Sequence, residues 1–189
     1  GDAPAPVEFP HFPSRLHAVV WRNWDLVPLD RLAHAVGALP AELRRMGRAM
    51  GLKGPPRIRP ETQARSTITV IRRNWHLLPY GQLLHLLGWT PEQMAYALRE
   101  DDFLYVKLGN HKPRCAPVRY TPIDERTRSR EREIARITRE LTSAPSATKR
   151  DPLFGFVEHL SSAPPPTRAR RESPRLKPRF CCSYFALYG

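Results

Sequence analysis

The apolar residues of this chain recur at helical spacing in several separate stretches. Ile68, Ile71 and Trp75 stand three or four positions apart, which places them on one face of a helix. This spacing predicts a helix over residues 65–77. A second helix is predicted to begin at Pro79, with an apolar face made by Leu83, Leu84, Leu86 and Leu87.

The residues after these leucines indicate where one helix ends and the next begins. Gly88 is suited to end a helix because glycine adopts the left-handed conformation without steric cost. Thr90 can accept a hydrogen bond from the first turn of a following helix, and Pro91 lacks the N–H that this turn leaves without a partner. A third helix is therefore predicted over residues 91–100, with Met94, Ala95 and Leu98 on its buried face.

The same pattern occurs once more, 51 residues earlier in the chain. Copy one lies within residues 14–55 and predicts helices near 14–26, 29–36 and 40–50, and copy two spans 63–110. Matching tryptophans, prolines and glycines in register indicate an internal duplication. The paired residues include Arg22/Arg73, Asn23/Asn74, Trp24/Trp75, Pro28/Pro79, Leu32/Leu83, His34/His85, Gly37/Gly88 and Pro40/Pro91.

Each copy has the outline of a helix-turn-helix unit, in which a first helix precedes two helices joined by a short glycine turn. The tryptophans are expected to anchor the first helix of each copy against the other two. The expected structural anchors of the duplication are Trp24, Trp75, Pro28, Pro79, Gly37 and Gly88.

The segments outside the duplicated helices differ in character. Residues 1–13 are rich in proline and predict an extended arm. Phe103–Leu108 predicts a strand, and the Gly109-Asn110 turn after it suggests a small β wing. Residues 121–142 predict a charged surface helix that begins with Thr121 as the cap. Its narrow apolar stripe consists of Ile134, Ile137 and Leu141.

The remaining residues predict a linker and a last strand. Residues 143–178 form the linker, with a short helix at 152–160 and a disordered stretch rich in proline and arginine. Residues 179–189 are apolar and aromatic, which is typical of a buried strand that needs neighbours. We expect this strand to begin a truncated downstream domain. The predicted fold class is mostly α, with two tandem three-helix repeats.

Charge is unevenly distributed along the chain, whose net charge is +13. Residues 1–110 hold 14 basic and 10 acidic side chains, whereas residues 111–189 hold 17 and 8. The duplicated region is thus mildly basic, and the following segment carries most of the excess. A basic segment of this kind can bind nucleic acid, an acidic membrane surface or an acidic partner. The alternative interpretation is a solvated linker.

The sequence favours a cytoplasmic protein. Its three cysteines, Cys115, Cys181 and Cys182, form no CxxC pair, and their odd number argues against a disulfide framework. No run of about 18 apolar residues is present that could span a membrane. The first ten residues lack the basic and then apolar pattern of a signal peptide.

No motif of a catalytic, metal-binding or cofactor-binding site occurs. The seven histidines and three cysteines form no HxxxH or CxxC ligand pattern, and no GxSxG, P-loop or GxGxxG sequence is present. Glu100, Asp101 and Asp102 are adjacent, but neighbours in sequence point in different directions and do not make a catalytic pair. We therefore predict no catalytic residue, no metal and no cofactor in these residues.

DNA binding is an alternative function. Arg44, Arg45 and Arg48 in the third helix of copy one suit a recognition helix that contacts phosphates and bases. Copy two offers Arg99 together with Glu92, Gln93 and Tyr96. The three acidic residues that follow Arg99 would repel phosphate. Copy one would therefore bind DNA alone or together with the basic segment.

The sequence also resembles a known group of proteins. The runs that carry the resemblance are Arg73-Asn74-Trp75-His76-Leu77-Leu78-Pro79-Tyr80, Leu86-Leu87-Gly88-Trp89-Thr90-Pro91-Glu92, Leu98-Arg99-Glu100-Asp101-Asp102-Phe103-Leu104, Val106-Lys107-Leu108-Gly109 and the closing Ser183-Tyr184-Phe185-Ala186-Leu187-Tyr188-Gly189. They are similar to the N-terminal region of large uncharacterised bacterial proteins that carry a glycoside-hydrolase-like (β/α) barrel downstream.

The resemblance implies a non-catalytic accessory module whose partner is the downstream domain of the same protein. The catalytic carboxylates of such a barrel would lie beyond Gly189. Two other hypotheses remain open at this stage: a helix-turn-helix DNA-binding protein, and an interaction scaffold with an apolar groove for a partner helix.

Overall fold

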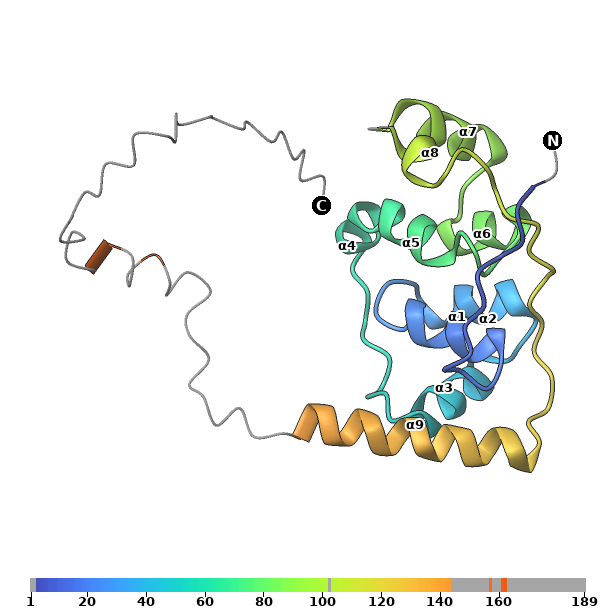
Figure 1. The fold of residues 1–189 in the computed structure, drawn as a ribbon, viewed down its shortest axis with the longest axis vertical. Helices are drawn as coiled ribbons and strands as arrows, with labels where there is room; N and C mark the ends of the chain where they lie inside the picture. Colours follow the sequence, from blue (N-terminus) through green and yellow to red (C-terminus); the bar gives the residue numbers. More distant parts are fainter. Residues whose placement is uncertain (1–2, 102, 144–156, 158–160, 163–189) are drawn as a thin grey trace, which may run out of the picture. The chain divides into compact units, whose positions relative to one another are not determined.

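The structure is a computed structural model that describes residues 3–101, 103–143, 157, 161 and 162 (Figure 1). The chain divides into two units, residues 1–143 and 144–189. Within the described residues the fold is mostly helical and contains no strand. The helices are α1 (Arg15–Asn23), α2 (Leu29–Val36), α3 (Pro40–Ala49), α4 (Pro60–Arg65), α5 (Thr67–Asn74), α6 (Tyr80–Leu87), α7 (Pro91–Glu100), α8 (Leu104–Lys107) and α9 (Glu125–Ser143).

The duplicated sequence forms corresponding helices, which we call repeat 1 (α1, α2 and α3) and repeat 2 (α5, α6 and α7). The residues predicted to begin and end these helices occupy the expected places. Gly37 ends α2 and Gly88 ends α6, both in the left-handed conformation with φ 67°. Pro28 and Pro79 immediately precede α2 and α6. Local sequence therefore determines where these helices begin and end.

The third helix of repeat 2 begins with the predicted capping arrangement. The Thr90 side chain accepts a hydrogen bond from the Gln93 N–H at 3.3 Å, and the Gln93 side chain accepts one from the Thr90 N–H at 2.9 Å. Pro91 occupies the first helical position. In repeat 1 Leu39 stands at the position of Thr90, and its side chain cannot accept a hydrogen bond. The other bond of the arrangement is present, because the Glu42 side chain accepts one from the Leu39 N–H at 2.8 Å.

Both tryptophan anchors are buried and bonded in the same way. Trp24 is 7% exposed and Trp75 is 1% exposed. The Trp24 indole N–H donates to the Lys53 carbonyl at 2.8 Å, and the Trp75 indole N–H donates to the His111 carbonyl at 3.0 Å. The acceptor lies 29 residues downstream in repeat 1 and 36 residues downstream in repeat 2. The longer path in repeat 2 contains α8.

The prediction of a β wing at Phe103–Leu108 is wrong. This segment contains α8, a single helical turn, which follows Phe103 in the left-handed conformation with φ 55°. A hairpin needs more strands or a covering helix to be stable, whereas the helical turn buries Leu104 to 3% exposure in the core. Tertiary packing of one leucine therefore prevails over the strand propensity of the segment.

The charged helix was predicted at 121–142 and begins later. Helix α9 starts at Glu125, where the Asp124 side chain accepts a hydrogen bond from the Thr127 N–H at 2.7 Å, so the cap is Asp124 and not Thr121. The predicted apolar stripe is also partly wrong. Ile134 packs against the core, but Ile137 is 41% and Leu141 76% exposed. Helix α9 packs against α3 (Figure 1).

Two short segments complete the described part of the chain. The proline-rich arm lies along the helices, with Phe12 against Trp21 and Phe9 under the Arg22 guanidinium at 5.4 Å. Helix α4 was not predicted, although Pro60 stands at its first position. None of the described helices has the length and apolar character needed to cross a membrane.

Other predictions fall on residues that the structure does not describe. The short helix at 152–160 is described only at Val157, which is helical. The linker up to residue 178 is described only at residues 157, 161 and 162 and at Ser143, which ends α9. The strand at 179–189, with Cys181 and Cys182, lies outside the described residues.

Candidate interaction surface

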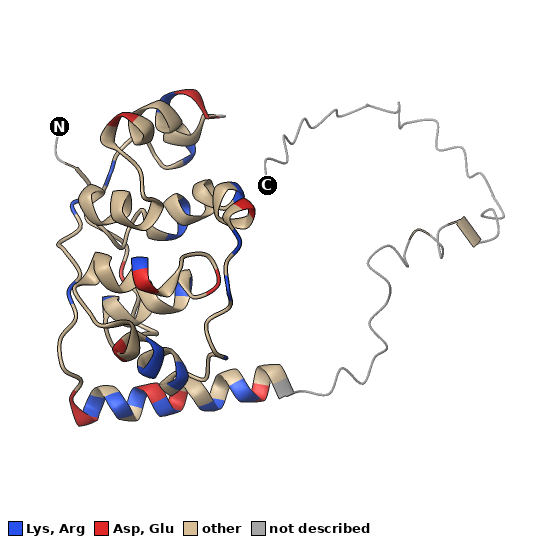
Figure 2. Ribbon diagram, turned by 180° about the vertical axis from the view of Figure 1, so that it is seen from behind, with Lys and Arg blue, Asp and Glu red and all other residues tan. Residues whose placement is uncertain are grey.

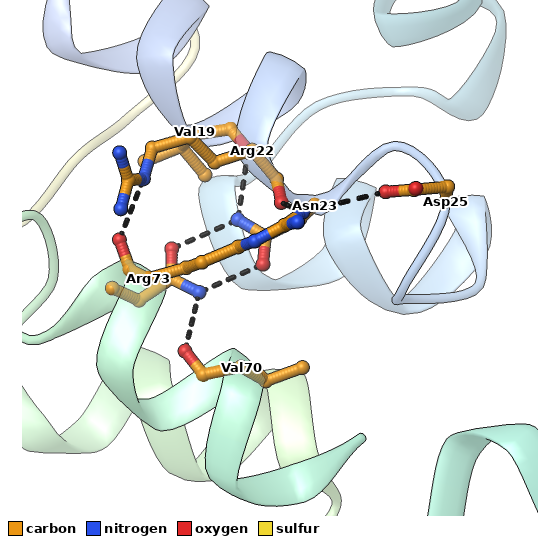
Figure 3. Close-up of polar contacts among 7 residues, drawn as sticks. Val19, Arg22, Asn23, Asp25, Val70 and Arg73 are labelled. Carbon is orange, nitrogen blue, oxygen red and sulfur yellow. Dashed lines mark hydrogen bonds and ion pairs between the residues drawn. The ribbon is translucent and has the colours of Figure 1, made fainter. Parts of the chain in front are cut away.

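The two repeats meet through equivalent residues, and the centre of the contact is a pair of asparagines (Figure 3). The Asn23 side-chain N–H2 donates to the Asn74 amide oxygen at 2.8 Å, and the Asn74 N–H2 donates to the Asn23 amide oxygen at 2.7 Å. Each amide also donates to the carbonyl four residues earlier in its own helix, Val19 or Val70, at 2.8 Å. Both asparagines are fully buried, so every N–H of this pair is satisfied within the protein.

Two arginines repeat this exchange at the ends of α1 and α5. The Arg22 Nε donates to the Arg73 carbonyl at 2.8 Å, and the Arg73 Nη1 donates to the Arg22 carbonyl at 2.8 Å (Figure 3). Carbonyls in the last turn of a helix lack intrahelical partners and carry the negative end of the helix dipole. Each guanidinium therefore caps the first helix of the other repeat.

Helices α2 and α6 form the second half of the contact. The Arg31 Nη1 donates to the Leu87 carbonyl at 3.2 Å, and its counterpart Gln82 donates to the Ala35 carbonyl at 2.7 Å. The rings of His34 and His85 meet edge to face, with centroids 5.2 Å apart. Contacts between equivalent residues are the mark of an isologous interface. The two repeats therefore pack like the subunits of a symmetric dimer joined in one chain.

This central contact is structural. The two asparagines are fully buried, and no buried side-chain nitrogen or oxygen in the described residues lacks a hydrogen-bond partner. The sequence showed that Asn23, Asn74, Arg22 and Arg73 are duplicated, but not that equivalent residues touch each other.

A buried polar pair attaches α9 to repeat 1. His17 on α1 and Glu131 on α9 are both 2% exposed, and the His17 Nε2 lies 3.1 Å from the Glu131 carboxylate. Burial lowers the pKa of His17 more than Glu131 raises it, and nearby Arg45 lowers it further. Neither residue was singled out from the sequence, because they stand 114 positions apart in segments with no common motif.

A lysine holds the loop that follows α5 in repeat 2. The Lys112 ammonium donates to the carbonyls of Trp75 and Leu78, each at 2.7 Å, and lies 5.3 Å from the centre of the Trp75 ring. Burial lowers the pKa of Lys112. The buried thiol of Cys115 lies 3.5 Å from the same ammonium. These bonds fix the loop after α5 and give Lys112 a structural role.

The described surface carries its most exposed aromatic side chains around α7 and α8. Phe103 is 74% and Tyr96 61% exposed, and the neighbouring aliphatic Val106 is 58% exposed. A shallow apolar depression of about 440 Å³ is lined by Ala95, Leu98, Arg99, Phe103, Tyr105 and Val106. We call these residues the α8 face. Large contiguous patches of exposed apolar side chains are typical of interaction sites.

The arginines proposed for DNA binding fall into two groups. Arg44, Arg45 and Arg48 are exposed on α3, whereas Arg99 lies on α7 at the other end of the bundle and pairs with Glu100 (Figure 1). Helix α9 packs against α3. The fold therefore brings the three arginines of α3 together but does not bring Arg99 to them.

The described residues contain no group of three or more His, Cys, Asp or Glu side chains placed to hold a metal ion. Comparison of the chain with protein-family models, with curated proteins and with solved structures finds no match in any of the three.

Proposed function

We propose that the duplicated helical domain is a non-catalytic docking module whose binding surface is the α8 face. The observation that carries this proposal is the exposure of Phe103, Tyr105 and Val106 around an apolar depression. Burying a side chain such as phenylalanine is worth about 1.5–3 kcal/mol. An exposed cluster of this kind therefore favours a partner surface that covers it.

The partner we propose is a glycoside-hydrolase-like barrel encoded downstream in the same protein. This assignment comes from the resemblance of residues 73–109 and 183–189 to the N-terminal region of such proteins. In this proposal the barrel supplies the catalytic groups, and the helical module holds or regulates it. Fold resemblance alone does not establish an activity, so the partner needs a direct test.

The test begins with the gene, read beyond the codon for Gly189. The segment encoded there is produced separately and titrated against the 189-residue chain by calorimetry. We expect binding, and we expect Phe103→Asp to weaken it at least tenfold, or about 1.4 kcal/mol. A reading frame without a barrel overturns the partner assignment, and unchanged binding by Phe103→Asp overturns the assignment of the surface.

DNA binding remains a second proposal because arginines gather on adjoining helices. Figure 2 shows basic residues on α3 and along α9, which packs against it. Several arginines of α9 are neutralised by ion pairs to Glu125, Glu133 and Glu140, whereas α3 contributes Arg44, Arg45 and Arg48. Binding of this type weakens steeply with salt. A gel-shift series in rising salt tests this proposal, with the variant Arg44→Glu/Arg48→Glu as the control. We expect binding that weakens with salt and that the variant loses, and the absence of such binding rejects the proposal.

A further inference from the structure

Three side chains from the start of α1 and from α9 form a continuous row of hydrogen bonds. The Ser14 hydroxyl lies 2.7 Å from the His17 Nδ1, and the His17 Nε2 lies 3.1 Å from the Glu131 carboxylate. His17 and Glu131 are each 2% exposed, whereas Ser14 is an exposed residue. A hydroxyl, an imidazole and a carboxylate joined in this order are the groups that activate a serine as a nucleophile.

The carboxylate determines which nitrogen of His17 carries the proton. A carboxylate only accepts hydrogen bonds, so the Nε2 that faces Glu131 carries the N–H. The Nδ1 is then the acceptor for the Ser14 hydroxyl. Burial lowers the pKa of His17 from 6.5, so the imidazole is neutral at pH 7 and able to take up a proton. Serine proteases use the two nitrogens the other way round, but the order of donors and acceptors is the same.

Backbone groups beside Ser14 are suited to stabilise an oxyanion. The first two backbone N–H groups of α1, those of Arg15 and Leu16, donate to no acceptor among the described residues. Such groups point toward the N-terminus of the helix and carry the positive end of its dipole. Donors of this kind stabilise the negative charge that develops on oxygen during acyl transfer.

A hollow of about 640 Å³ lies beside the row and offers room for an acyl donor. Its lining includes Pro13, Thr127 and Arg130. Pro13 directly precedes Ser14 in the chain, and Arg130 directly precedes Glu131. Most of the lining side chains are polar, so the hollow suits the ester of a short polar acid better than a long hydrocarbon chain.

Repeat 2 shows that the fold does not require this row. With the 51-residue offset of the duplication, Arg65 and Ile68 stand where repeat 1 has Ser14 and His17. Helix α5 begins without a side-chain cap, yet the helices of the two repeats correspond. Burying an ionisable pair is often no more stabilising than burying apolar side chains of the same size. Stability alone therefore does not account for the three groups.

We propose that Ser14 is a reactive serine that takes up the acyl group of a short polar ester, with His17 as its general base and Glu131 as the residue that positions His17. The Ser14 Oγ bonds to the carbonyl carbon of the ester, and the bond from that carbon to the leaving oxygen breaks. The Oγ proton passes to the His17 Nδ1 and then to the leaving alcohol. The products are one acylated serine per chain and one free alcohol.

This modification goes beyond the docking function and involves no residue of the α8 face, so either proposal can fail without the other. The probe is a fluorescent alkyl fluorophosphonate, which bonds to activated serine hydroxyls and releases fluoride. We expect the 189-residue chain to be labelled once and peptide mass spectrometry to place the label on Ser14. Ser129 is the internal control, because it is exposed on α9 and none of the described hydrogen bonds joins it to a histidine.

A matched variant separates reactivity from helix capping. Ser14 also caps α1, since its Oγ accepts from the His17 backbone N–H at 3.4 Å. Ser14→Asp keeps a capping side chain but has no hydroxyl, so we expect it to lose the label at an unchanged melting temperature. We expect His17→Gln to slow labelling by about 100-fold or more, the usual contribution of a general base.

The pH profile tests the positioning role of Glu131. Labelling is expected to slow as the pH falls below 6.5, because protonated His17 accepts no proton from Ser14. Glu131 raises the pKa of His17, whereas burial and Arg45 lower it. Glu131→Gln is therefore expected to slow labelling about tenfold or more and to move the midpoint of the profile to lower pH, which a purely structural role would leave in place.

Three results would overturn the proposal. The first is a folded wild-type chain in which the probe leaves Ser14 unlabelled. The second is a label on Ser129 that forms as fast as the label on Ser14, since that serine lacks the histidine. The third is a His17→Gln chain that melts like the wild type and is labelled at the same rate, because Ser14 would then serve only as a helix cap.

Discussion

Repeat 1 and repeat 2 share a sequence pattern and corresponding helices, but their third helices pack differently. Helix α3 contacts both α1 and α2, whereas α7 packs mainly against α8. Gly47 allows the close packing in repeat 1, because a Cβ at this position would lie 2.3 Å from the Trp24 ring. Repeat 2 has Leu98 at the corresponding position, and its tryptophan cannot approach the third helix in the same way.

A second bulky residue acts in the same direction. Trp89 stands in repeat 2 where repeat 1 has Ala38, at the turn before the third helix. In repeat 2 the third helix α7 has α8 as its main neighbour. The comparison shows that a duplicated domain can conserve its central contact while its third helices pack against different neighbours.

The largest effect is expected from transferring the residue of repeat 2 into repeat 1. Gly47→Leu forces a side chain into the Trp24 ring, and overpacking of a core costs about 1–3 kcal/mol. We expect a loss of unfolding free energy near the upper end of that range in urea titrations. Leu98→Ala in repeat 2 is the control for a change of size at the equivalent position. A Gly47→Leu protein as stable as the wild type would contradict the proposed origin of the difference.

The next prediction concerns the centre that the repeats share. Asn23→Leu leaves the buried Asn74 amide without its partner, which costs about 1–3 kcal/mol. The double variant Asn23→Leu/Asn74→Leu removes both polar groups and is expected to be more stable than the sum of the two single changes implies. Unfolding free energies of the four proteins give the coupling directly, and strict additivity would argue against a reciprocal pair.

The caps of the third helices offer a smaller and reciprocal test. Thr90→Ala removes a cap and should cost about 1 kcal/mol, whereas Leu39→Thr adds the equivalent cap to α3 and should stabilise by a similar or smaller amount. Leu39 is 66% exposed, so the change disturbs no packing. Thermal unfolding of both variants measures the two effects. If both substitutions changed the stability in the same direction, local capping would not be what limits these helices.

The smallest effect is expected from pH, because opposing influences act on His17. Its pKa in the folded protein is lowered from 6.5, mainly by burial and against the pull of Glu131. The unfolded chain therefore binds the proton more readily, so stability is lost as the pH falls below 6.5 toward the lowered pKa. His76 shifts in the same direction, so both contribute to the slope. Melting temperatures of wild type and His17→Gln between pH 8 and 5 isolate His17, whose variant should show the shallower slope.

Several features of the fold were predictable because they depend on neighbouring residues alone. The helices of both repeats follow from the spacing of apolar residues. The ends of α2 and α6 follow from Gly37 and Gly88, which adopt the left-handed conformation, and the start of α7 follows from Thr90, which caps it. The β wing and the start of α9 were predicted wrongly, since Leu104 and Asp124 act through packing and capping that propensity does not capture. The burial of Glu131 was missed because its partner His17 is remote in the sequence.

The sequence by itself determined the duplication, the helices within each copy and the burial of both tryptophans. The spacing of apolar residues and the residues that begin or end a helix are local properties of the chain. The tertiary structure alone decided that equivalent residues touch across the two repeats, that α9 packs against repeat 1 and that the third helices have different neighbours. Those outcomes depend on side-chain volume and charge at positions far apart in the chain. The repeats differ at such positions, as with Gly47 against Leu98 and His17 against Ile68, while their helices correspond.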